Sequence, residues 1–215
     1  MGGEVTVEEL VLIGGGEHAT VVVDVARTRP DRWRVKGFCN AAPTPRMESA
    51  GVPWLGDDPT QLPGPARLIL ATGGLGVSNR RADLVRRFTV TGGPDWAPLV
   101  HATAYVSPTA TIAPGALVCA GAVVNPGAVV GAHCIVNTGA IVEHDVHLGA
   151  FTMLGPGVVV GGGAVIGDGS FLGLGCRVRD HVQIGAGATV AMGAVVIGSV
   201  AAGGFVLGVP ARPKK

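Results

Sequence analysis

The sequence is poor in aromatic residues and in long apolar runs, and each scarcity excludes a class of protein. Aromatic residues make up 4% of the 215 residues, which excludes a core of large rings and favours thin aliphatic layers. No apolar run approaches the roughly 18 residues that span a bilayer, and the first residues do not have the pattern of a signal peptide. A net charge of +1 does not indicate nucleic-acid or membrane binding. We therefore expect neither partner.

The four cysteines also lack a pattern. They show neither close pairing nor the spacing of a zinc site, and their positions are Cys39, Cys119, Cys134 and Cys176. Such cysteines are typical of buried thiols in a reducing compartment. We expect a cytoplasmic protein without a bound metal.

The sequence contains 36 glycines. It also contains a six-residue repeat. From Val100 to Val196 every sixth residue is Val, Ile or Leu, and the residue four positions later is small or β-branched. Neither the 3.6-residue period of a helix nor the two-residue period of a strand fits. Six residues can instead form one face of a triangular prism, and 18 residues one coil, stacked at about 4.8 Å. The repeat predicts a left-handed parallel β-helix over residues 97–215.

These repeats, with the closing segment Gly208–Arg212, resemble those of the hexapeptide-repeat acyltransferases. The resemblance implies a homotrimer that binds acyl-CoA in the groove between two β-helices.

Residues 1–96 carry the pattern of a Rossmann-like βαβαβ domain. An apolar strand at 9–13 leads into Gly14, and Gly14, Gly16 and Ala19 have G-x-G-x-x-G/A spacing before a helix expected over 20–27. Further strands are expected at 35–39 and 67–72, and a second helix at 79–88. Glycines let the backbone approach a phosphate, and the helix N-terminus favours an anion.

A dinucleotide is a poor fit to this domain, because Asn40 replaces the acidic residue that would bind the ribose. A mononucleotide or a nucleotide-sugar fits its short length better. The alternative is a glycine-rich turn that merely connects a strand to a helix.

The combination of this domain with the β-helix resembles the sialic-acid O-acetyltransferases and bacillosamine N-acetyltransferases over almost the whole chain. By this resemblance Gly14, Gly16 and His18 lie near a diphosphate, and Asn40 near the base or ribose. Weaker candidates follow the third strand, at Gly73, Gly74 and Asn79.

Glu143, His144 and Asp145 form the densest polar cluster of the repeat region. The repeat points Val142 inward, so these three side chains face outward. An imidazole beside a carboxylate makes a general base near neutral pH. Eighteen residues after His144 lies Gly162, which should stack beside it and could offer an N–H to an oxyanion.

The family resemblance assigns roles to the same residues. It makes His144 the catalytic histidine, Asp145 the residue that orients its ring, and Gly162 the donor to the acetyl carbonyl. Asn137 opens the motif that ends at Asp145 and is expected on the sugar side.

Acetyl-CoA is expected to pass Leu174 and Met192. Many bacillosamine-type members carry a second histidine where this sequence has Met153, a thioether that can only line the thioester pocket. In this respect the sequence is expected to resemble more closely the perosamine N-acetyltransferases, which act on a GDP-linked 4-amino sugar.

The hypothesis is an acetyl-CoA-dependent N-acetyltransferase that acts on the 4-amino group of a nucleotide-linked deoxy sugar. A sialic-acid or polysaccharide O-acetyltransferase is the first alternative. A non-catalytic scaffold would need neither the Glu143–Asp145 cluster nor the glycine-rich turn. A carbonic-anhydrase-like metalloprotein would need three converging histidines, which the repeat does not supply.

Overall fold

The structure, a computed structural model, describes residues 7–62, 64–74, 80–89 and 95–214. The chain divides into two compact units, the first ending at Ala102 and the second beginning at Thr103. Among the helices within the described ranges, none is long and apolar enough to cross a membrane.

The first unit is built on a parallel sheet of three strands in the order β2-β1-β3. The central strand β1 has its apolar run buried, with Leu10 and Leu12 fully inaccessible, as expected for a strand covered on both faces. The elements of this unit are β1 (Glu8–Ile13), α1 (Glu17–Arg27), β2 (Trp33–Cys39), α2 (Pro45–Ser49), the short 3-10 helix η1 (Pro59–Gln61), β3 (Arg67–Leu70), α3 (Arg80–Phe88) and β4 (Leu99–Val100).

Helix α1 begins at Glu17, three residues before the predicted start at Thr20. Gly16 precedes it in an extended conformation, and the carboxylate of Glu17 lies in the first turn, where the helix dipole favours an acidic residue. As a result, His18 belongs to the first turn of α1 and not to the loop before it.

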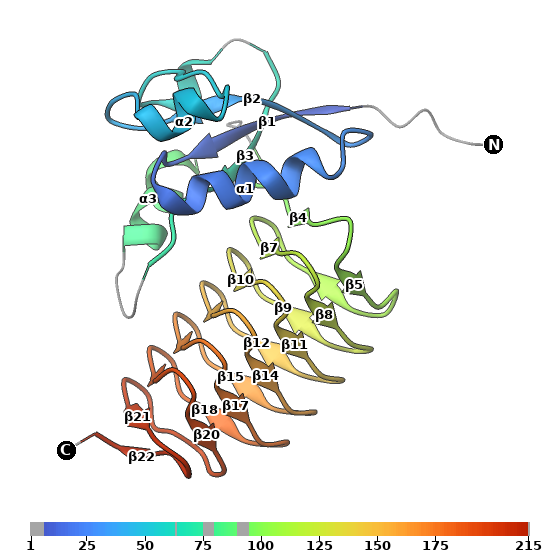
Figure 1. Cartoon of the computed structure of the whole chain (residues 1–215), viewed down its shortest axis with the longest axis vertical. Coiled ribbons are helices and arrows are strands. Elements are labelled where there is room, and N and C mark those ends of the chain that lie inside the picture. Colours follow the sequence, from blue (N-terminus) through green and yellow to red (C-terminus); the bar gives the residue numbers. More distant parts are fainter. Residues whose placement is uncertain (1–6, 63, 75–79, 90–94, 215) are drawn as a thin grey trace. The chain divides into compact units, whose positions relative to one another are not determined.

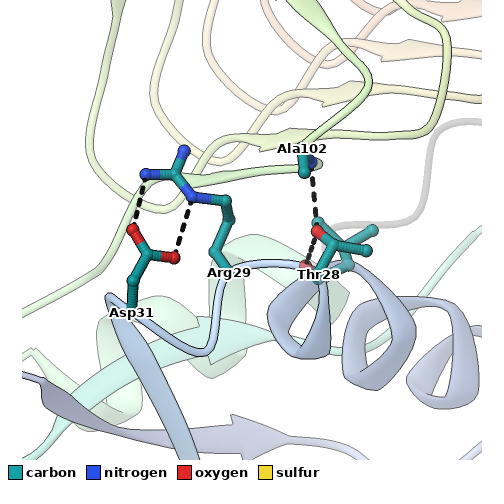
Figure 2. A network of polar contacts seen from close by, with 5 residues as sticks. Thr28, Arg29, Asp31 and Ala102 are labelled. Atoms are coloured by element: carbon teal, nitrogen blue, oxygen red, sulfur yellow. Dashed lines mark hydrogen bonds and ion pairs between the residues drawn. The ribbon is translucent and has the colours of Figure 1, made fainter.

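The hydroxyl of Thr28 ties the end of α1 to the last residues of the same unit (Figure 2). It donates to the Val25 carbonyl at 2.7 Å and accepts from the Ala102 N–H at 3.0 Å. Beside it, Arg29 and Asp31 form two hydrogen bonds of 3.2 and 3.1 Å. The point at which the chain leaves the unit is therefore fixed by a specific contact.

The second unit is the left-handed parallel β-helix that the repeat predicts (Figure 1). Every third strand lies on the same face of the prism. We name the three faces the β10 face, the β11 face and the β12 face. The strands are β5 (Tyr105–Val106), β6 (Thr111–Ile112), β7 (Leu117–Val118), β8 (Val123–Val124), β9 (Val129–Val130), β10 (Ile135–Val136), β11 (Ile141–Val142), β12 (His147–Leu148), β13 (Met153–Leu154), β14 (Val159–Val160), β15 (Val165–Ile166), β16 (Phe171–Leu172), β17 (Arg177–Val178), β18 (Gln183–Ile184), β19 (Thr189–Val190), β20 (Val195–Val196), β21 (Phe205–Leu207) and β22 (Arg212–Pro213).

Each coil pairs with the next at an offset of 18 residues. Ile141 pairs with Val159, and Val142 with Val160. In the repeat strands β5 to β20 the second residue points inward, and Val142 and Val160 are fully buried. The inward phase predicted from the repeat is therefore confirmed, and the first residue of each strand faces outward.

The chain turns from one face to the next through two-residue corners, most of which place a glycine in the left-handed backbone region that suits it. Four described residues that are not glycine share this conformation at their corners, with φ values of 55° to 59°, and they are His133, Asp145, Phe151 and His181. The rings of His133 and Phe151, one coil apart, stack with centroids 5.0 Å apart. Packing accounts for that pair.

Candidate functional site

Asp145 and His181 lie on a different edge, between the β11 and β12 faces. We call this edge the histidine corner; it consists of residues 144–145, 162–163 and 180–181, which are the turns after β11, β14 and β17. His144 Nδ1 and Asp145 Oδ2 are 3.0 Å apart. Both side chains are largely exposed, at 61% and 73%, so a ligand can reach the imidazole.

The backbone of the histidine corner is held by the coils on either side. The Asp145 N–H donates to the Pro126 carbonyl at 3.0 Å, and the Gly163 N–H donates to the His144 carbonyl at 2.9 Å. Gly127, one coil before Asp145, leaves the space that the carboxylate fills, since a Cβ there would lie 2.4 Å from Asp145 Oδ1. The carboxylate and the imidazole therefore start from a rigid frame.

The imidazole of His144 leans over Gly162, as the 18-residue period predicts. A Cβ at Gly162 would lie 2.6 Å from His144 Nε2, so no other residue leaves room for the ring in this position. In the described part of the chain the Gly162 N–H donates no hydrogen bond. An unused N–H thus lies directly beside an exposed imidazole nitrogen.

The pKa of His144 is raised above its ordinary value. The main cause is the hydrogen bond with Asp145, to which the negative charges of Asp145 and Glu143 add. When Nδ1–H donates to the carboxylate, Nε2 remains free to accept a proton. An imidazole paired in this way is chemically able to take up a proton, and the N–H beside it is able to donate to a negative oxygen.

Apart from Gly162, the residues expected to line the CoA and sugar sites of the β-helix do not lie at the histidine corner. Met153 is the outward residue of β13, on the β10 face, which is opposite that corner. Leu174 and Met192 occupy the edge between the β10 and β11 faces, which we call the methionine corner, and Asn137 enters the same edge. Leu174 and Met192 are exposed, at 49% and 74%.

In the first unit, the glycine-rich turn after β1 meets the end of β3. A Cβ at Gly14, where φ is +114°, would lie 2.6 Å from Thr72 Cγ2, and one at Gly73 would contact the ring of His18. Gly16 and Gly74 both face open space. In the part of the chain that the structure describes, two buried atoms here have no hydrogen-bond partner, His18 Nε2 and Thr72 Oγ1.

Burial lowers the pKa of His18 to about 4, and the charge of Arg81 contributes to the shift. His18 is therefore neutral near pH 7. Arg81 lies on α3 and is 8% exposed. The N-terminus of α1 has no side-chain cap, so its first N–H groups can bind an anion. These features suit a diphosphate.

Asn40 follows β2 at the same end of the sheet. Its side-chain amide donates to the backbone carbonyl of Ala42. The backbone carbonyl of Asn40 accepts from Trp54 Nε1 at 2.9 Å. The indole of Trp54 is 43% exposed and offers an aromatic surface next to Asn40. The remaining candidate of this unit, Asn79, lies outside the described residues.

The described cysteines and acidic residues form neither a thiolate nucleophile nor a metal site. Burial raises the pKa of Cys119 and Cys176 to about 12 and that of Cys39 to about 11, so these thiols stay protonated. Within the described ranges no group of three or more His, Cys, Asp or Glu side chains could hold a metal ion.

Comparison with solved structures identifies the family. A variant of perosamine N-acetyltransferase from Caulobacter crescentus in which one histidine is replaced by asparagine, solved with CoA and GDP-perosamine, is 34% identical to this chain, with a TM-score of 0.86 and 98% of each chain covered. This chain belongs to the hexapeptide-repeat sugar N-acetyltransferases. The acetyltransferase domain of PglB from Neisseria gonorrhoeae, solved with acetyl coenzyme A, is 30% identical, with a TM-score of 0.85, covering 97% of this chain and all of that one.

WeeI from Acinetobacter baumannii, 23% identical with a TM-score of 0.79, covers 97% of this chain and all of its own and shares the fold of the family. Neither a protein-family model nor a curated protein matches the sequence.

Three residues near the candidate sites of this family member were not found from the sequence. Thr72 lies against Gly14, and the charge of Arg81 acts on His18. Their positions, just after β3 and in the following helix α3, were the signal that could have found them. His181 lies one coil beyond Gly163, so the 18-residue period could have placed it at the histidine corner.

The Asp145→Asn variant tests the electrostatics of the histidine corner. We expect the pKa of His144, followed by its ring-proton NMR signal, to fall, because the charged acceptor that stabilises the imidazolium is lost. The ascending limb of activity against pH should move to lower pH, since the base loses its proton earlier. An unchanged His144 titration would contradict the assigned hydrogen bond.

Proposed function

We propose that the chain transfers the acetyl group of acetyl-CoA to the 4-amino group of a nucleotide-linked amino-deoxy sugar, such as GDP-perosamine or a UDP-4-amino sugar. One observation carries the proposal. His144 is bonded to Asp145 at 3.0 Å, and its ring leans over Gly162, whose N–H is unused within the described chain. Acyl transfer needs a base and an oxyanion donor side by side.

In the proposed reaction the amine attacks the thioester carbonyl directly. Nε2 of His144 takes a proton from the amine, and Asp145 stabilises the imidazolium that forms. Glu143 adds negative charge, and the Gly162 N–H donates to the carbonyl oxygen as it becomes negative. The high pKa of the buried cysteines supports a route without a cysteinyl acyl-enzyme.

The domain predicted over residues 1–96, which falls in the first unit, would bind the nucleotide end of the acceptor. Gly14, Gly16 and His18 would meet the diphosphate, and Asn40 the base or ribose. Gly73 and Gly74 keep the turn after β3 free of side chains. The unpartnered Nε2 of buried His18 supports this role, because a buried polar atom needs a partner.

An amine acceptor is favoured over the hydroxyl acceptor of an O-acetyltransferase. The perosamine relative was solved with an amino sugar and CoA, also in variants in which one histidine is replaced. We place the reaction in the cytoplasm, in keeping with four cysteines that are buried and form no disulfide.

We infer that the enzyme is a homotrimer whose sites combine two copies. His144 lies on the histidine corner, whereas Leu174 and Met192 lie on the methionine corner, at the other edge of the β11 face. Most outward side chains of that face are apolar, including Val123, Ile141, Val159 and Val195, and the charged exception is Arg177. A second copy packed there would cover them, and a cyclic arrangement brings unlike edges together.

In such a site acetyl-CoA would run between the two edges, with Leu174 and Met192 along its apolar arm. Met153 and Asn137 would come from the copy that provides the methionine corner.

A panel of acceptors tests the reaction. With acetyl-CoA and GDP-, UDP- or dTDP-linked 4-amino sugars, we expect thiol release with at least one amino sugar and none with the matching 4-hydroxy sugars. Turnover of hydroxyl acceptors alone would contradict the N-acetyltransferase assignment.

The His144→Asn variant tests the base. It keeps a polar side chain of similar reach but lacks the imidazole nitrogen that would accept the proton. Its kcat should fall by about 10² to 10⁴, while calorimetry shows CoA binding unchanged. Near-normal kcat would exclude His144 as the base.

Mixed oligomers test whether the site combines two copies. We expect His144→Asn and Met192→Asp each to be nearly inactive at low acetyl-CoA, and their re-assembled mixture to recover about a quarter of full activity, because random pairing restores one site in four. Mixing His144→Asn with Gly162→Ala, both on the histidine corner, should recover nothing. Equal results from the two mixtures would contradict the shared site.

A further inference from the structure

Two imidazoles lean over a single pair of glycines at the histidine corner. A Cβ at Gly162 would lie 2.6 Å from Nε2 of His144, and a Cβ at Gly163 would lie 2.5 Å from Nδ1 of His181. His144 comes from the coil before the glycines and His181 from the coil after them. The Gly162–Gly163 backbone is therefore a floor without side chains, with an imidazole on either side.

The position of His181 is unusual within the repeat. Its φ is +55°, in the left-handed region that glycine adopts at most corners. Asp145, in the same conformation, bonds to His144, and His133 stacks on Phe151. The side chain of His181 makes no hydrogen bond, ion pair or ring contact with the described residues. A strained backbone without a structural benefit points to a function.

The backbone of His181 is part of the same frame as the oxyanion donor. Its N–H donates to the Gly162 carbonyl at 2.9 Å. In the proposed reaction the Gly162 N–H binds the thioester oxygen, and His144 receives the proton of the amine that enters from its side. The thioester sulfur would then point along this edge toward the next coil. His181 is the imidazole on that side.

We propose that His181 is a second catalytic residue, which protonates the departing sulfur of the acyl thioester; this rests on the proposed function. The amine nitrogen bonds to the carbonyl carbon and loses a proton to His144. When the C–S bond breaks, the electron pair goes to sulfur, which takes a proton from a ring nitrogen of His181. Exchange with water then moves the proton of His144 to solvent and restores that of His181, so that the net products are the amide and the free thiol.

The test is His181→Gly, a substitution to the residue that this backbone conformation favours. We expect kcat to fall about 100-fold, with the KM for acetyl-CoA changing less than about threefold. Added imidazole should restore kcat in a saturable manner, because it can fill the space of the lost ring and supply the proton. A kcat that stays normal, or a loss that imidazole does not restore, would overturn the proposal.

Two further variants make the outcome unambiguous. His133→Gly is the same substitution in the same backbone conformation at another corner, and its kcat should neither fall nor respond to imidazole. His181→Asn, whose side chain tolerates positive φ, should lose kcat without responding to imidazole at all, and melting curves of each variant verify folding.

The two proposals fail in different ways. If His144→Asn keeps its activity, the proposed function fails. If His144→Asn is inactive while His181→Gly has a normal kcat, only the role of His181 is wrong.

Discussion

The hydrogen-bonded register between successive coils is the constraint on which the candidate site depends. Each coil pairs with the next at an offset of 18 residues, as Ile141 does with Val159. This register passes through the histidine corner, where the Gly163 N–H binds the His144 carbonyl and the His181 N–H binds the Gly162 carbonyl. Residues that are far apart in sequence therefore become neighbours without any loop to hold them. Inserting one residue between two coils would separate the imidazole from the glycine N–H.

His18 and His144 lie in different surroundings, which shift their pKa values in opposite directions. His18 is enclosed by the first unit, and burial lowers its pKa to about 4, so it stays neutral and can donate a hydrogen bond to a diphosphate. His144 stands at an exposed corner beside a carboxylate, which raises its pKa and favours proton uptake. Burial acts against the charged form and a neighbouring carboxylate acts for it. The division of the chain into two units provides both environments.

The sequence predicted what depends on periodicity. The repeat gave the β-helix, the inward direction of Val142 and the position of His144 beside Gly162. The same period places Met153, nine residues or half a coil after His144, on another face, and its expected place at the thioester pocket stays a prediction. Helix α1 was predicted to start three residues late, because Gly16 as an extended cap looks the same in sequence as a loop residue. The left-handed backbone of His181 and the tilt of its ring had no signal in a pattern of residue types.

The most direct measurement for the central claim is a crystal structure with acetyl-CoA, or with a non-hydrolysable analogue, bound. The account predicts that the acyl oxygen accepts a hydrogen bond from the Gly162 N–H at about 2.7–3.2 Å, with His144 Nε2 facing the carbonyl carbon from the side where the amine enters. An acyl group bound at another edge of the β-helix, with the Gly162 N–H left unused, would contradict it.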